Sequence, residues 1–135
     1  MKKLCIGVLI IMMSIINSGC SHDQKENKYQ SHIDKVMEIQ QETHKEMVKK
    51  SDQVTPKFNK DQVNTYVFED GKLIIISYKL FKDKDELFYA TYEFKDDKIY
   101  YKRDIDPKTY VKEHHPDYKD IKVKSVSYTH LTLPT

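Results

Sequence analysis

The alternation of apolar and polar positions divides the chain into a helical part and a later β part. From residue 29 to residue 50, apolar side chains recur at steps of three and four, charges occupy the other positions, and no glycine or proline interrupts. The apolar positions are Tyr29, Ile33, Val36, Met37, Met47 and Val48. Gln40 and His44 share this stripe, either as ligands at a pocket floor or as polar residues on a helix flank near solvent, and we expect the flank. The pattern predicts one amphipathic helix over 29–50.

After a connection over 51–61 that contains Pro56, the period changes to two, which predicts β-strands. The expected strands cover residues 63–68, 72–81, 87–95 and 98–103. Asp70-Gly71 and Asp96-Asp97 are expected as tight turns, and the charged segment 82–86 as a loop. Ile74, Ile75 and Ile76 are apolar on both faces, so the second strand should be central in the sheet.

The second tight turn defines the two faces of the sheet. Pairing across it sets Phe94 opposite Ile99 and Tyr92 opposite Tyr101, and this side is expected to face the helix. The opposite side then carries Leu87, Tyr89 and Tyr100. Unless a C-terminal segment folds across it, this exposed aromatic face is the expected interaction face for a protein partner or a second copy. The alternative is that tyrosine merely suits a strand with one solvated face.

The C-terminal part of the domain predicts a short helix and one more strand. Asp106 can cap a helix that begins at Pro107, since proline is favoured at the first helical position. Pro116 stops this helix, and the apolar residues at 118, 121 and 123 could then add an edge strand.

The first twenty residues have the pattern of a secretory leader. Lys2 and Lys3 precede an apolar run over 4–16, which is shorter than the roughly 20 residues needed to span a bilayer. Ser18 and Gly19 then lead to Cys20, and the segment resembles a bacterial lipobox although Asn17 stands where leucine is usual. The resemblance implies cleavage before Cys20 and acylation of its thiol, with palmitate among the expected acyl chains. An ordinary cleaved signal or a short membrane anchor is the alternative.

The last ten residues differ in composition from the charged chain before them. Residues 126–135 contain no Lys, Arg, Asp or Glu and resemble the translation of a sequencing adapter. We therefore expect this tail to be an artefact and give it no weight in the fold or the function.

Charge and composition exclude several classes of function. Without the two lysines of the leader and the uncharged tail, residues 20–125 carry 21 basic and 21 acidic residues. This balance does not favour nucleic-acid binding, which needs a basic surface. With Cys5 removed and Cys20 acylated, no disulfide or thiol nucleophile remains. Gly71 is the one glycine of residues 20–125, which excludes a glycine-rich phosphate loop.

The candidate chemistry is sparse. His114, His115 and Asp117 form the one imidazole–carboxylate cluster, but adjacent residues on a helix point about 100° apart and zinc usually needs three or four protein ligands. The paired acids at 96–97 and 83/85 lie in expected turns, where a solvated role is typical. We therefore expect no enzyme, no metal site and no cofactor.

One long helix followed by an antiparallel meander resembles the cystatin fold. The segments SHDQKENKYQSHIDKVMEIQ, YVFEDGKLIIISYK and TYEFKDDKIYYKRD, together with the leader, resemble the staphylococcal cystatin-like fold lipoproteins, a domain family of unknown function. The resemblance implies an α+β domain in which a long N-terminal helix packs on a four-stranded antiparallel meander, followed by a short C-terminal helix. It brings no catalytic residues. The hairpin over 67–72 also lacks the Gln-x-Val-x-Gly motif of protease-inhibiting cystatins.

These observations give an expected organisation and role. Residues 1–19 are expected as a lipoprotein signal peptide, 20–28 as a polar, lipid-anchored tether, and 29–125 as the cystatin-like domain. The expected role is that of a non-catalytic binding module on the extracytoplasmic face of the cell membrane of a Gram-positive bacterium. The alternative is a small ligand carrier or a hydrolase that uses a cavity between helix and sheet.

Overall fold

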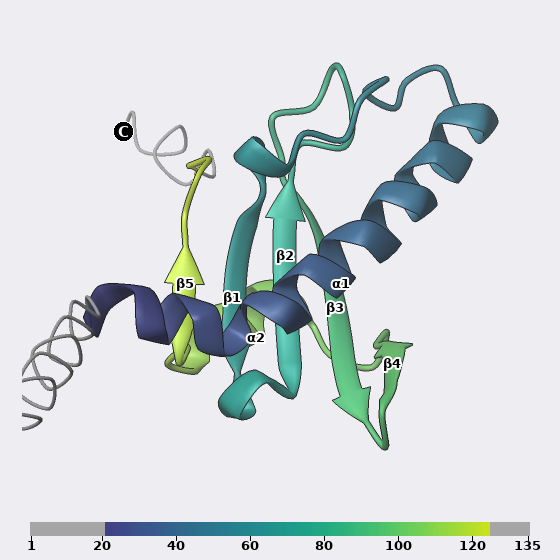
Figure 1. Cartoon of the computed structure of the whole chain (residues 1–135). Coiled ribbons are helices and arrows are strands. Elements are labelled where there is room, and N and C mark those ends of the chain that lie inside the picture. The colour runs from purple at the N-terminus through teal and green to yellow at the C-terminus, as the bar shows by residue number, and fades with distance from the viewer. Residues whose placement is uncertain (1–20, 125–135) are drawn as a thin grey trace, which may run out of the picture.

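A computed structural model of the chain describes residues 21–124, so the expected leader, Cys20 and the expected tail lie outside the described residues. The helices are α1 (Ser21–Lys50) and α2 (Pro107–Glu113). The strands are β1 (Asn64–Phe68), β2 (Leu73–Tyr78), β3 (Phe88–Lys95), β4 (Lys98–Tyr101) and β5 (Tyr118–Asp120). They form one antiparallel sheet in the order β4-β3-β2-β1-β5, and α1 runs diagonally across one face of it (Figure 1).

Helix α1 ends at Lys50 as expected but begins at Ser21, eight residues before Tyr29. Residues 21–28, which were expected as part of a polar tether, are therefore helical. Eight helical residues rise about 12 Å, against about 28 Å for an extended chain. Within residues 21–124, no helix is both long and apolar enough to cross a membrane.

The apolar stripe of α1 packs on the sheet as its periodicity predicts. Its residues Tyr29, Ile33, Val36 and Met37 are buried against Val67, Ile74, Ile76, Ala90 and Tyr92 of the sheet. The pairs Phe94↔Ile99 and Tyr92↔Tyr101 form as expected, and Phe94 and Ile99 pack against the same core. The helix-facing side of the sheet is thus the predicted one.

The sheet is wider than the expected four strands. Strand β2 is central, and all three of its isoleucines are fully buried because both faces of the sheet are covered at that position. A fifth strand, β5, pairs with β1 through contacts such as Val67↔Tyr118. Of the three residues that suggested an edge strand, Tyr118 lies in β5, which completes the sheet on the side opposite β4, whereas Ile121 and Val123 follow the strand.

The two hairpin turns differ. Asp96 and Asp97 both have positive φ and form the expected two-residue turn between Lys95 and Lys98. Between β1 and β2, however, the paired residues Phe68 and Leu73 enclose four residues rather than two. This longer turn contains a 3₁₀ segment at Glu69–Gly71.

The β1–β2 turn is held by α1. The Tyr29 hydroxyl donates to the Asp70 carboxylate at 3.1 Å, and His32 Nδ1 lies 2.8 Å from the Gly71 carbonyl oxygen, to which it can only donate. Gly71 has φ +92°, a conformation that favours glycine. These contacts explain why the turn does not close as a simple two-residue hairpin.

The outer face of the sheet is not left in water. Helix α2 and Ile105 pack on Phe68, Leu73 and Ile75, with the rings of Phe68 and Tyr110 5.0 Å apart in an edge-to-face contact. Leu87, which was expected on an exposed face, is buried with 5% of its surface exposed. The outer face, which was expected to be open unless a C-terminal segment folded across it, is therefore covered at one end by Ile105 and α2.

Candidate functional site

Strand β3 is covered by β4 along only half of its length. Strand β2 pairs with β3 from Phe88 to Glu93, whereas β4 pairs only with Tyr92 to Lys95. After Tyr101 the chain leaves the sheet, with a last backbone bond from Lys102 N to Thr91 O at 2.9 Å. The Lys102 ammonium contacts Glu93 at 3.1 Å and Asp104 at 3.4 Å. Within residues 21–124, the first residues of β3 therefore have no strand neighbour on their β4 side.

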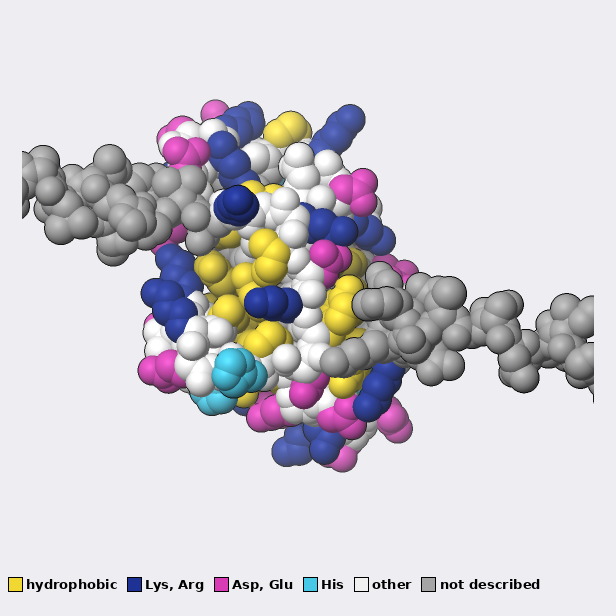
Figure 2. All heavy atoms as spheres, turned by 90° about the vertical axis from the view of Figure 1, so that its left-hand side faces the viewer, with side chains coloured by type: hydrophobic (Ala, Val, Ile, Leu, Met, Phe, Trp, Pro, Cys, Tyr) yellow, Lys and Arg dark blue, Asp and Glu magenta, His cyan; other side chains and the backbone are white. Residues whose placement is uncertain are grey.

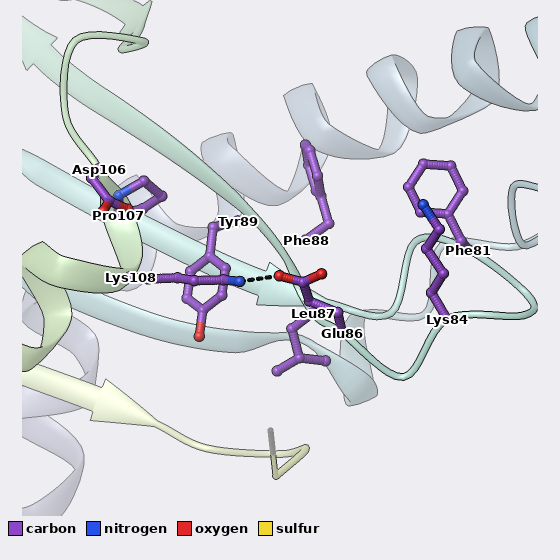
Figure 3. A pocket seen from close by; sticks show the side chains of 9 residues that line it. All are labelled: Phe81, Lys84, Glu86, Leu87, Phe88, Tyr89, Asp106, Pro107 and Lys108. Carbon is purple, nitrogen blue, oxygen red and sulfur yellow. Dashed lines mark hydrogen bonds and ion pairs between the residues drawn. The ribbon is translucent and has the colours of Figure 1, made fainter. Parts of the chain in front are cut away.

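A hollow of about 410 Å³ lies at this uncovered part of β3 (Figure 3). Its walls come from the loop before β3, from β3 itself and from the start of α2. The lining residues are Phe81, Lys84, Glu86, Leu87, Phe88, Tyr89, Asp106, Pro107 and Lys108. Tyr89 and Leu87 point to one side of the sheet and Phe88 points to the other, toward α1 (Figure 3). The volume of the hollow is within the range of sites for small ligands or short peptide segments.

Charged groups border the hollow, and most of them are paired. The Lys108 ammonium binds the Glu86 carboxylate, and this hydrogen bond lowers the pKa of Glu86 and raises that of Lys108. The Asp106 carboxylate accepts from the Thr109 hydroxyl at 2.6 Å, which lowers the pKa of Asp106. Lys84 instead lies over the ring of Phe81, 4.9 Å from its centroid, with no carboxylate of the described residues within ion-pair distance.

The structure brings together two of the three residues predicted for the interaction face. Leu87 and Tyr89 line the hollow, whereas Tyr100 lies on β4, pairs with Glu93 and is 46% exposed. The sequence pattern did not identify Lys84, Lys108 or Phe81 as site residues. Lys84 lies in the segment 82–86, which was expected only as a charged loop, whereas Phe81 ends an expected strand and Lys108 lies in the expected short helix. The one available signal was that the charged loop 82–86 is followed directly by a strand whose first expected residue, Leu87, is apolar.

A second hollow of about 430 Å³ shares Leu87 and Tyr89 with the first. Its other lining residues are Asn64, Tyr66, Lys119, Ile121, Val123 and Lys124. Tyr66 is half-buried, and this burial raises the pKa of its phenol. Seen from the side that carries β5, hydrophobic atoms reach the surface between lysine and acidic side chains (Figure 2).

The polar residues of the α1 stripe form a buried hydrogen-bond chain. The Tyr92 hydroxyl donates to Gln40 Oε1 at 2.5 Å, and Gln40 Nε2 donates to the Tyr78 hydroxyl at 2.8 Å. His44 Nε2 lies 2.7 Å from the Thr55 carbonyl oxygen, which can only accept, so Nε2 carries the proton. His44 Nδ1, 3.2 Å from the Tyr78 oxygen, then accepts the Tyr78 hydroxyl.

The expectation that Gln40 and His44 lie on a flank near solvent was wrong, since both are 1% exposed. They bond to sheet tyrosines and to a backbone carbonyl instead. A hollow of about 280 Å³ borders His44, but its other walls are Gln41 and Lys45 of α1 and the segment Pro56–Phe58. It lies beside that connection and not between helix and sheet.

The expected imidazole–carboxylate cluster is dispersed. His114 Nδ1 lies 3.0 Å from the Tyr110 carbonyl oxygen and its ring stacks on Tyr110, whereas the Asp117 carboxylate accepts from the Asp70 backbone N–H at 2.8 Å. His115 is exposed. In the part of the chain that the structure describes, no three His, Cys, Asp or Glu side chains are grouped closely enough to hold a metal ion.

A long helix laid across an antiparallel sheet places the chain in the class of cystatin-like folds. The chain belongs to the family described as a domain of unknown function with cystatin-like fold (DUF4467), whose model matches residues 29–122. A crystal structure of a DUF4467 family protein from Staphylococcus aureus subsp. aureus Mu50 is similar, with 38% identity and a TM-score of 0.65. The match covers 71% of this chain and 99% of that chain. Among curated proteins, none matches significantly.

Proposed function

We propose that this protein is a non-catalytic binding module, held at the extracytoplasmic face of the cell membrane by lipid on Cys20. The hollow at the start of β3 supports the binding role, because it combines apolar walls with the half-buried Tyr89 and unpaired charge at Lys84. The membrane role is supported by the leader, in which a short apolar run and two small residues precede Cys20.

The alternative role, a ligand carrier or hydrolase with a site between helix and sheet, has less support. Gln40, His44 and Tyr78, the polar side chains best placed for such a site, already bond to one another. A ligand that reached them would have to break bonds that are buried and satisfied, at a cost of about 1–3 kcal/mol for each group left unpaired.

The lipid anchor can be tested with the two cysteines of the leader region. We expect Cys20→Ala to abolish incorporation of labelled fatty acid and release from the precursor by the lipoprotein peptidase. Cys5→Ala is the matched control and should leave both unchanged, because that residue is removed with the leader. Retained acyl labelling of the Cys20→Ala protein would refute the anchor.

The binding role can be tested with two tyrosines that the structure separates. The domain is used as bait for cell-envelope proteins and glycopolymers, with a photo-crosslinking residue in place of Phe81 beside the hollow. We expect Tyr89→Ser to reduce crosslinking at least tenfold, whereas Tyr100→Ser, on exposed β4, should leave it unchanged. Urea unfolding checks that both variants are folded. Equal effects of the two substitutions would place the binding surface elsewhere.

A further inference from the structure

The open part of β3 presents unused backbone groups. Phe94 N donates to Lys72 O on the β2 side, whereas Thr91 O accepts from Lys102 N on the β4 side. Since backbone groups alternate along a strand, those of even-numbered β3 residues face β2 and those of odd-numbered residues face the opposite edge. The N–H and C=O of Tyr89, and of Leu87 just before the strand, therefore point to the edge that β4 leaves uncovered.

The uncovered edge coincides with the 410 Å³ hollow. Leu87 and Tyr89 line it, and no hydrogen bond joins the backbone of either residue to another described residue on that side. The hollow lies beside the Asp106–Lys108 segment (Figure 3), on the edge of β3 with which β4 pairs further along. A segment placed there would extend the existing β3–β4 pairing rather than create a new kind of contact.

We propose that the occupant of this site is an extended peptide segment of a partner protein, which adds to β3 as a strand at Leu87–Tyr89. This inference names the ligand class of the site and so rests on the proposed binding function. Backbone donors and acceptors at strand spacing are complementary to another peptide backbone, whereas a sugar or a lipid tail offers no such repeat. The N–H and C=O of Tyr89 pair with one residue of the incoming strand.

The side chains around the edge specify the peptide further. On the side facing α1, Phe81 and Phe88 provide an apolar surface, which fits an apolar side chain of the peptide. Glu86 and Asp106 are already paired, whereas the Lys84 ammonium lies over the Phe81 ring and has no carboxylate of the described residues within ion-pair distance. The site therefore favours an extended segment with alternating apolar residues and a neighbouring carboxylate.

The Lys108–Glu86 ion pair crosses the hollow in front of the Tyr89 ring, with the Lys108 ammonium 5.9 Å from the ring centroid (Figure 3). Both side chains are substantially exposed, and exposed ion pairs contribute little to stability. The pair can therefore move aside when a strand enters.

The test uses the purified domain. The similar crystal structure supports this choice, because 99% of that chain is matched by 71% of this one, so that the solved protein corresponds to the domain alone. The probes are blocked octapeptides of alternating valine and threonine that carry two, one or no aspartates, and a copy of each with N-methylated amides on one edge. Binding is followed through the amide resonances and hydrogen exchange of Tyr89 and Ala90. Without peptide, the Tyr89 amide should exchange quickly, and the Ala90 amide, which faces β2, should be protected.

If the strand adds, the acidic octapeptide should slow Tyr89 exchange at least tenfold and leave Ala90 unchanged, and N-methylation should abolish binding. Lys84→Glu should weaken the acidic peptide about fivefold, as expected for one exposed charge pair. Lys50→Glu at the end of α1 is the matched control and should have no effect.

Three results would overturn the inference and still leave the proposed function standing. The first is binding that shifts the Leu87 and Tyr89 side-chain signals but is unaffected by N-methylation, which would indicate a pocket ligand. The second is Tyr89 protection that appears without peptide and rises with protein concentration, which would assign the edge to a second copy. Failure of all octapeptides to bind, with the Tyr89→Ser crosslinking difference intact, would likewise exclude strand addition.

Discussion

Gln40 connects the helix to two tyrosines of the sheet, and its replacement gives a quantitative test of the structure. Gln40→Met keeps the length of the side chain and removes both of its polar atoms. The Tyr92 hydroxyl then loses its acceptor in a buried environment, which costs about 1–3 kcal/mol. The Tyr78 oxygen loses a donor but still donates to His44, so this second loss is about 1 kcal/mol.

The expected total is a fall of about 2–4 kcal/mol in the free energy of unfolding, out of about 5–15 kcal/mol for a domain. Urea unfolding should show this as a midpoint lower by about 1–2 M at an unchanged slope. In the Gln40→Met background, Tyr92→Phe removes a hydroxyl that has already lost its acceptor. It should therefore lower the free energy of unfolding by less than the same substitution does in the wild type. Additive effects of the two substitutions, or a loss below about 0.5 kcal/mol for Gln40→Met, would refute the hydrogen-bond chain.

Two further predictions concern the β1–β2 turn and the buried phenols. Gly71→Ala should lower the free energy of unfolding by about 1–3 kcal/mol, because φ is +92° and a Cβ there would lie 3.1 Å from Tyr29 Cδ1. The neighbouring Lys72→Ala is the control, and equal urea midpoints for the two variants would contradict this account. Burial raises the pKa of Tyr78 to about 12 and also raises that of Tyr92. Above pH 10 the unfolded chain releases these phenol protons, whereas the folded chain keeps them. The free energy of unfolding is therefore highest below about pH 10 and should fall by about 1.4 kcal/mol per pH unit for each phenol between pH 10 and 12. Unfolding at pH 9, 10 and 11 with Tyr78→Phe as control tests the sign, and a stability that stays level above pH 10 would contradict it.

The order of apolar and polar residues was enough to predict the helices and strands and the faces that they bury. The period of 3.6 placed Tyr29, Val36 and Met37 on one stripe, and that stripe is the buried face of α1. The period of two and the Asp96-Asp97 turn predicted the Phe94↔Ile99 pair, because residues that face each other across a two-residue turn have their register set locally. The run Ile74–Ile76 identified the central strand for the same kind of reason, since a strand that is apolar on both faces has to be covered on both.

Only the tertiary structure decided the parts on which the proposed site depends. Strand β4 ends at Tyr101, next to the ion pairs of Lys102 with Glu93 and Asp104, and among the described residues this end leaves the edge at Tyr89 open. The cover over the outer face comes from α2, whose packing on Phe68 joins positions more than forty residues apart. The tyrosine partners of Gln40 and His44 lie 34 to 52 residues away in the sequence. A local pattern records which face of an element is apolar, but it does not record which distant side chain meets that face or where a neighbouring strand stops.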